Sequence, residues 1–232
     1  MEHTHIVGRF DKDLNKIEAR ILAMGALVAA QLRDATATLA APDGAEITRI
    51  VTVDRRINGM NGAIVKRCER LIALRQPMAM DLREAMSPIN VAGELERVGD
   101  HAKSTAKRAR KLGADRIPEE QLEIIMQMSA IVQTQLEAVL RAYSDGDIDL
   151  SRLICDQDRQ VDALNRALFK GAVKTLTSSG DNAKSIMHAV LISRNFERVG
   201  DHIVNIARHV IHIVTGADVA SKVETDDGLD GK

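Results

Sequence analysis

The sequence predicts an all-α protein made of two tandem, pseudo-symmetric three-helix bundles. Three observations support this prediction. The hexapeptide Glu96–His101 recurs unchanged as Glu197–His202, 101 positions later. Between evident turn signals, apolar residues recur at intervals of three and four, as expected for helices with one buried face. Hydrophobic residues make up 45% of the chain and aromatic ones only 2%, so the core must be aliphatic, which suits closely packed helices.

The duplication extends well beyond the hexapeptide. Asp54-Arg55 falls on Asp158-Arg159 at an offset of 104, and Met86 falls on Met187 at an offset of 101. A repeat of about a hundred residues is too long for a solenoid and suits two small domains. We therefore expect one three-helix unit at 8–113 and a second at 114–217. The acidic segment 218–232 has the composition of a disordered tail.

Each element is delimited by turn-forming residues. In the first copy we predict helices at 10–40, 46–75 and 78–112, which are separated by Pro42-Asp43-Gly44 and by Gln76-Pro77 and followed by Gly113. Pro88 lies inside the third helix and predicts a kink there. The glycines of Asn58-Gly59 and Asn61-Gly62 lie inside the second, where either close packing requires them or the helix breaks.

In the second copy we predict helices at 118–144, 148–177 and 182–215. Pro118 suits a first helical turn because it lacks only an amide donor that is not needed there, and the two glutamates that follow it face the positive end of the helix dipole. Asp145-Gly146-Asp147 and the serines and glycine around 178–180 separate the remaining helices.

Composition and charge argue against two classes of function. The formal net charge is −1 and aromatic residues are few, so nucleic-acid binding is not expected. The longest apolar run, from Ile21 to Ala30, is about half of the roughly 20 residues that a membrane span needs. We expect a soluble, cytoplasmic protein without direct membrane insertion, in which Cys68 and Cys155 remain reduced thiols.

The repeated hexapeptide places two carboxylates on one row of each helix. Glu96 and Asp100 are one turn apart, with Ser104 a further turn along, and the equivalent row of the second copy is Glu197, Asp201 and Asn205. Each acid row lies roughly 120° from the centre of its apolar stripe, and therefore on the flank or outer face of its bundle. Further acids on the second and fifth helices could face these rows: Asp54, Asp158 and Asp162.

Two interpretations of these acids remain open. Repulsion among them would be relieved by a bound cation, and oxygen donors favour iron, manganese, magnesium or calcium. Alternatively, Arg97 and Arg198 pair with Asp100 and Asp201 at a spacing of three, and the rows are solvated surfaces.

Several motifs in this order resemble the PhoU family, the bacterial phosphate-specific transport system accessory proteins. They are Asp54-x-x-Ile57, Gln76-Pro77-Met78-Ala79-x-Asp81-Leu82-Arg83, Asp158-x-x-Val161-Asp162, both hexapeptides and Val214-Thr215-Gly216. The resemblance implies two similar three-helix bundles and a homodimer.

The resemblance also implies multinuclear metal clusters, usually of iron or zinc, on the bundle surfaces. The ligands it implies are Glu96 and Asp100 with Asp54, and Glu197 and Asp201 with Asp158 and Asp162. Asn58 stands where the fifth helix has Asp162, so the first site has one carboxylate fewer and is expected to bind metal more weakly.

The function that the resemblance implies is regulation rather than catalysis. When phosphate is sufficient, such a cytoplasmic adaptor would restrain the phosphate ABC transporter, through its ATPase subunit, and the sensor histidine kinase of the phosphate-starvation regulon. It would lie at the inner membrane only through these partners. The alternative is a carboxylate-bridged iron protein with storage or oxidase activity, but such sites use Glu-x-x-His, which the sequence lacks.

Overall fold

The computed structural model describes residues 2–113, 115–178 and 182–217, and among these it contains six helices and no strand. The helices are α1 (Glu2–Ala40), α2 (Gly44–Arg75), α3 (Met80–Leu112), α4 (Glu119–Asp145), α5 (Ile148–Ser178) and α6 (Ala183–Thr215). The all-α prediction and the six predicted helices are confirmed. The predicted disordered tail, 218–232, lies outside the described residues.

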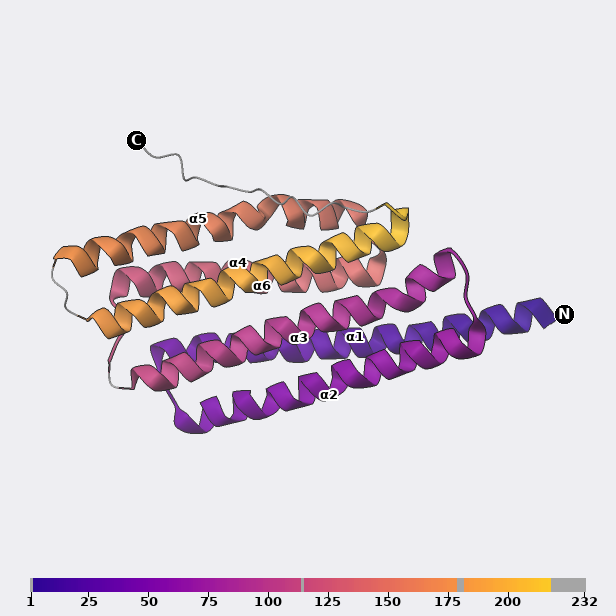
Figure 1. The fold of residues 1–232 in the computed structure, drawn as a ribbon, viewed down its shortest axis with the longest axis horizontal. Coiled ribbons are helices and arrows are strands. Elements are labelled where there is room, and N and C mark those ends of the chain that lie inside the picture. The colour runs from indigo at the N-terminus through magenta and orange to yellow at the C-terminus, as the bar shows by residue number, and fades with distance from the viewer. Residues whose placement is uncertain (1, 114, 179–181, 218–232) are drawn as a thin grey trace.

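The two copies form two three-helix bundles that lie side by side along their length (Figure 1). Helices α1, α2 and α3 contact one another in the first bundle, and α4, α5 and α6 make the second. The bundles meet where α3 packs against α6 and α1 against α4. The hexapeptides lie on α3 and α6, the two helices that meet at this junction.

One aliphatic core runs through both bundles. Side chains such as Met24, Val28 and Leu136 are fully or almost fully buried, and Phe10 and Phe196 are the only aromatic residues in the core cluster of the described residues. Two hydroxyls that this packing buries are paired across the junction. Thr36 Oγ1 lies 2.8 Å from Ser129 Oγ between α1 and α4, which satisfies both hydroxyls.

Local signals explain most helix boundaries. The side chain of Asp43 accepts a hydrogen bond of 2.9 Å from the amide of Ala45 and caps α2. Gly146 and Gly216 end α4 and α6 with φ of 65° and 70°, a left-handed conformation that favours glycine. Among the described helices, none is long and apolar enough to cross a membrane.

Three local features differ from the expectations or resolve them. Helix α1 begins at Glu2 rather than near residue 10, because nothing in this segment except Gly8 disfavours a helix. Helix α2 continues through Gly59 and Gly62, and a Cβ at either would meet no atom within 4 Å. The helix therefore neither breaks there nor needs glycine for packing. Helix α3 also continues through Pro88.

Candidate functional site

The glycine of each hexapeptide allows a neighbouring element to approach closely. A Cβ added at Gly200 would lie 3.3 Å from Asp158 Oδ1 on α5, and one added at Gly99 would lie 3.1 Å from Gln31 Oε1 on α1. Both distances are shorter than ordinary van der Waals contact. In the second copy, glycine therefore brings the carboxylate of Asp158 against the backbone of α6, beside Asp201.

In the first copy, a lysine joins the acids that the sequence singled out. Lys103 Nζ donates to Asp54 Oδ2 at 2.8 Å and to Asp100 Oδ1 at 2.5 Å. The Asp54 side chain is only 6% exposed, so this ammonium supplies the counter-charge that a buried carboxylate requires. Burial opposes the charge of Lys103, but the two hydrogen bonds outweigh it and raise the pKa of the lysine. We call Asp54, Glu96 and Asp100 the first acid cluster.

The pairing of Arg97 with Asp100, one of the two alternatives from the sequence, does not form. Arg97 Nε lies 3.9 Å from Glu96 Oε2, and Asp100 pairs with Lys103 instead. Burial, followed by the negative charge of Asp100, raises the pKa of Glu96. Lys103 can reach both aspartates because it lies one turn after Asp100 and faces α2.

In the second copy no lysine joins the acids. Val204 stands where Lys103 stands in the first copy, 101 positions earlier. Arg198 lies 3.5 Å from Asp201 and Arg194 lies 3.1 Å from Glu197, so the predicted Arg198–Asp201 pair forms. We call Asp158, Asp162, Glu197 and Asp201 the second acid cluster. Within the described part of the chain, no ion pair reaches Asp158 or Asp162.

The second acid cluster holds poorly compensated negative charge. Burial, together with the neighbouring charges of Asp162 and Asp201, raises the pKa of Asp158 to about 6. Burial is also the main cause of the raised pKa of Glu197 and of Asp201. Glu197 Oε2 is buried and accepts no hydrogen bond from any described residue. Such a cluster favours either a proton or a metal cation.

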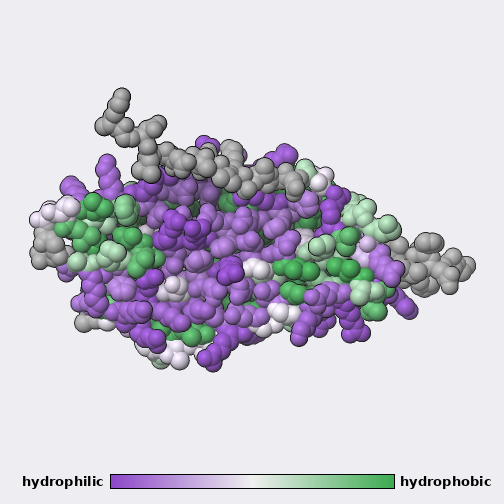
Figure 2. Space-filling model, in the orientation of Figure 1, coloured by the Kyte–Doolittle hydropathy of each residue, from purple (hydrophilic) through white to green (hydrophobic). Residues whose placement is uncertain are grey.

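A cavity of about 540 Å³ opens beside this cluster, between α5 and α6. Its walls carry both signs of charge. Three of the cluster's acids line it, and so do the guanidinium groups of Arg159, Arg166, Arg198 and Arg208. The cavity makes the cluster accessible to small ions. In the view of Figure 2, the middle of the molecule is hydrophilic and apolar surface gathers toward the two ends.

The two acid clusters differ in how well they suit a metal. Among the described residues, no group of three or more His, Cys, Asp or Glu side chains is assembled closely enough to hold an ion. In the first cluster, the Lys103 ammonium already occupies the position between two of the carboxylates, so these residues do not fit a metal. Each cluster contains one buried carboxylate oxygen without a hydrogen-bond partner among the described residues, Asp54 Oδ1 in the first and Glu197 Oε2 in the second. The second cluster differs in having four carboxylates and no lysine among them, and its oxygen donors suit a hard cation.

Of the two expected positions, the flank and the outer face of each bundle, the acid rows occupy the flank. The side chains of Glu96 and Glu197 are 21% and 15% exposed, because each row faces the seam with the preceding helix. The side chain of Asn205 does not join the acids of its row. It donates a hydrogen bond to Glu94 Oε2 at 3.4 Å across the junction and accepts one from Arg208 at 3.2 Å. Ser104 makes no side-chain hydrogen bond with any described residue.

A histidine pair links the two copies at the junction of α3 and α6. The rings of His101 and His202 stack with centroids 5.4 Å apart. His202 Nδ1 lies 2.7 Å from Glu94 Oε2, and His101 is hydrogen-bonded to Asn195. Asn195 occupies the position in the second copy that Glu94 occupies in the first. The two histidines thus occupy equivalent positions in the two copies, but His202 pairs with a carboxylate and His101 with an uncharged amide.

The comparison with family models decides which family this is. The PhoU domain matches twice, at residues 21–109 and 125–210. The chain belongs to the PhoU family. Each match contains one hexapeptide and its acid cluster, so the two PhoU domains coincide with the two copies seen in the sequence and the fold.

Relatives and solved structures support this assignment over nearly the whole length of the chain. It is 32% identical to a phosphate-specific transport system accessory protein PhoU homolog of Rhizobium meliloti, over 98% of this chain and 96% of that one. A homolog of the same description from Caulobacter vibrioides is also 32% identical, over 94% and 95%. The crystal structure of PhoU from Pseudomonas aeruginosa superposes with a TM-score of 0.86 at 31% identity, covering 90% of this chain and all of that one.

Sequence reasoning missed two residues beside the acid clusters. Neither Lys103, which pairs with acids of the first cluster, nor Glu94, which pairs with His202, was assigned a role from the sequence. The signal for Lys103 was present in the sequence, because aligning the copies at the 101-residue offset places it opposite Val204. Glu94 could not be found in this way, since its partners come from the other bundle.

Proposed function

We propose that this chain is a regulatory adaptor of phosphate homeostasis, as the PhoU resemblance implies. In phosphate sufficiency it restrains the phosphate ABC transporter and the sensor kinase of the phosphate-starvation regulon. The observation that carries the proposal is the match of both copies, over nearly the full chain, to proteins described as phosphate-specific transport system accessory proteins. The similar structure from Streptococcus pneumoniae, with a TM-score of 0.84 at 30% identity, is described as a phosphate transport system regulatory protein.

In this proposal the adaptor acts by binding rather than by catalysis. Its partners are the ATPase subunit of the transporter and the sensor histidine kinase, which it meets at the cytoplasmic side of the inner membrane. We also propose that it works as a homodimer. Light scattering during size-exclusion chromatography tests this part, and a mass of one chain at micromolar concentrations would contradict it.

We further propose that the second acid cluster holds a metal, iron or zinc, and that the first does not. Asp158, Asp162, Glu197 and Asp201 would provide the ligands. The bound metal would supply positive charge and join α5 to α6. The support is the contrast between Lys103, which pairs with Asp54 and Asp100, and Val204, which leaves the second cluster without an equivalent cation.

Gene deletion tests the regulatory proposal. A phosphate-responsive reporter should become active in phosphate-rich medium when the gene is deleted, and expression of the intact chain should silence it again. A reporter that stays silent in the deletion strain would contradict the repressor role. Turnover of ferrous iron by the purified protein would instead support the storage or oxidase alternative, whereas stoichiometric binding without turnover would support the adaptor.

A further inference from the structure

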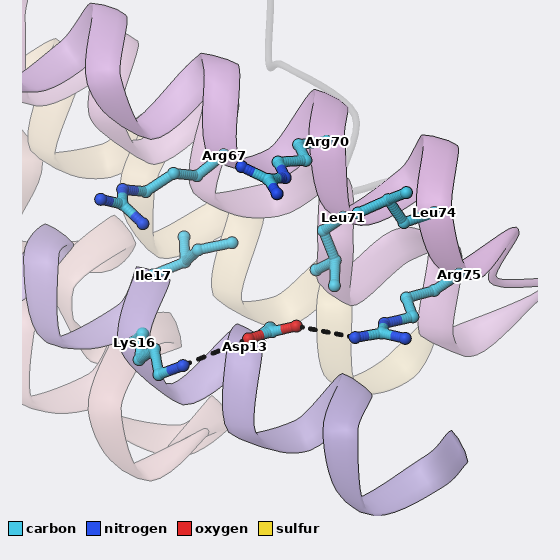
Figure 3. Close-up of a pocket in the computed structure, with 8 residues that line it drawn as sticks. All are labelled: Asp13, Lys16, Ile17, Arg67, Arg70, Leu71, Leu74 and Arg75. Carbon is cyan, nitrogen blue, oxygen red and sulfur yellow. Dashed lines mark hydrogen bonds and ion pairs between the residues drawn. The ribbon is translucent and has the colours of Figure 1, made fainter.

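A basic groove, lined by none of the residues of the acid clusters, lies between the first half of α1 and the end of α2 (Figure 3). Four cationic side chains line the groove, together with one carboxylate and three aliphatic residues. The cationic residues are Lys16, Arg67, Arg70 and Arg75, and the carboxylate is that of Asp13. The groove walls therefore carry three net positive charges.

Asp13 compensates only part of this charge. Its carboxylate lies between α1 and α2, 3.2 Å from Arg75 Nη2 and 3.3 Å from Lys16 Nζ, as Figure 3 shows. Arg67 and Arg70 form no ion pair with any described residue. In addition, Arg75 Nε is buried and no described acceptor reaches it. The groove thus offers unpaired guanidinium donors around a partly enclosed space.

The second copy shows that the fold does not require this charge. At the offset of 104, Lys16 corresponds to Glu120 and Arg67 to Gly171. The structure supports this correspondence, because a Cβ at Gly171 would lie 4.0 Å from Glu120 Oε1. The same place in the second bundle is therefore formed without these two cations, and the basic groove is a property of the first copy alone.

We propose that the α1–α2 groove binds a phosphate-type oxyanion. Planar guanidinium groups are suited to bidentate hydrogen bonding with phosphate oxygens. The groove volume of about 240 Å³ is below the roughly 300–1,000 Å³ of sites for drug-sized ligands, which favours a small anion over a nucleotide. Free inorganic phosphate and a lipid phosphate group share this chemistry. The proposal concerns a ligand and goes beyond the regulatory role, which does not depend on it.

Calorimetric titration of the full chain with inorganic phosphate, at fixed low ionic strength, tests the proposal. We expect binding tighter than about 1 mM, weakened at least about tenfold in the double variant Arg67→Gln with Arg70→Gln. The matched control is Arg55→Gln with Arg56→Gln, which removes the same charge from exposed positions of α2 outside the groove. Circular dichroism confirms that both variants are folded.

A second arm separates the two sources of the anion. The same proteins are sedimented with phosphatidylglycerol vesicles, and phosphatidylcholine vesicles serve as the uncharged comparison. Groove-dependent phosphate binding without vesicle binding supports the free ion, and groove-dependent binding to phosphatidylglycerol vesicles supports the lipid phosphate. The proposal is overturned if neither probe binds, or if binding weakens equally in the groove variant and its control.

Discussion

At the scale of single residues, two positions distinguish the acid clusters, and the first of them is Asn58, which stands where the second copy has Asp162. Lys103 places an ammonium between Asp54 and Asp100, whereas Val204 leaves the equivalent position of the second copy apolar. A buried carboxylate without a counter-charge is costly unless it takes up a proton or a cation. Lys103 therefore compensates part of the charge of the first cluster and occupies the place between two of its carboxylates, whereas the second cluster retains the capacity to bind a cation there.

Replacing Lys103 tests the first half of this contrast. Lys103→Met keeps the aliphatic stem but leaves Asp54 buried without its partner, so we expect the free energy of unfolding to fall by about 2–3 kcal/mol. Urea denaturation measures the change. Lys107→Met, an exposed position one turn later on α3, is the control and should change stability by no more than about 0.5 kcal/mol. Equal losses in both variants would show that the Lys103 contacts contribute nothing specific.

The raised pKa of Asp158 predicts a pH-dependent stability in metal-free protein. Its folded value of about 6 lies above the ordinary 3.8, so between these values the folded state binds more protons than the unfolded state. Stability then falls as pH rises through that window. Asp158→Asn removes this cost, and we expect it to stabilise the protein by about 1–2 kcal/mol near pH 7 and by almost nothing below about pH 4.

Urea unfolding at the two pH values, with EDTA present, measures this difference. Asp156→Asn is the control, because Asp156 is an exposed residue of the same helix. It should give no pH-dependent gain. A gain from Asp158→Asn that is the same at both pH values would mean that burial of its charge is not the cause.

At the scale of helices, glycine sets the spacing of the α5–α6 seam. Asp158 reaches the α6 backbone because Gly200 has no side chain, and the carboxylate oxygen would be 3.3 Å from a Cβ there. The hexapeptide therefore contributes more than its two acids. Its glycine positions a third carboxylate, from the neighbouring helix, against the same row.

Gly200→Ala should separate this packing role from helix propensity. Alanine in place of glycine favours a helix by roughly 1 kcal/mol, and Gly93→Ala should show this gain because a Cβ there meets nothing within 4 Å. At Gly200 the displacement of Asp158 should cancel the gain and lower affinity for zinc by about tenfold. Denaturation and metal titration measure the two effects. Unchanged affinity in Gly200→Ala would show that this approach does not position the ligand.

At the scale of the whole molecule, the sequence predicted the architecture well because the architecture is repeated and periodic. Six helices and their order followed from the hexapeptide repeat, the turn signals and the aliphatic composition, and the family followed from the resemblance of several motifs. The start of α1 was wrong, since no stop signal marks it. Contacts between the bundles were also missed. The pairs His202–Glu94 and Thr36–Ser129 join residues 108 and 93 positions apart, and helical periodicity gives no information on such partners.

The sequence predicted which acids lie together at the site, but not which cations pair with them. The sequence brought Asp54 to the Glu96–Asp100 row and Asp158 and Asp162 to the Glu197–Asp201 row. It indicated only Arg97 and Arg198 as ion-pair partners of these acids, whereas in the structure Asp100 pairs with Lys103. Two copies with identical hexapeptides therefore differ. The first carries the basic groove and an acid cluster with a lysine between two of its carboxylates, and the second carries an acid cluster in which no ion pair reaches Asp158 or Asp162 among the described residues.

Metal content is the most direct test of this asymmetry. Elemental analysis of the purified full-length protein, loaded with iron and desalted, should find metal in the wild type and in Glu96→Ala with Asp100→Ala. It should find almost none in Glu197→Ala with Asp201→Ala. Metal that disappears from the first pair of substitutions and persists in the second would contradict the assignment of the cation to the second acid cluster.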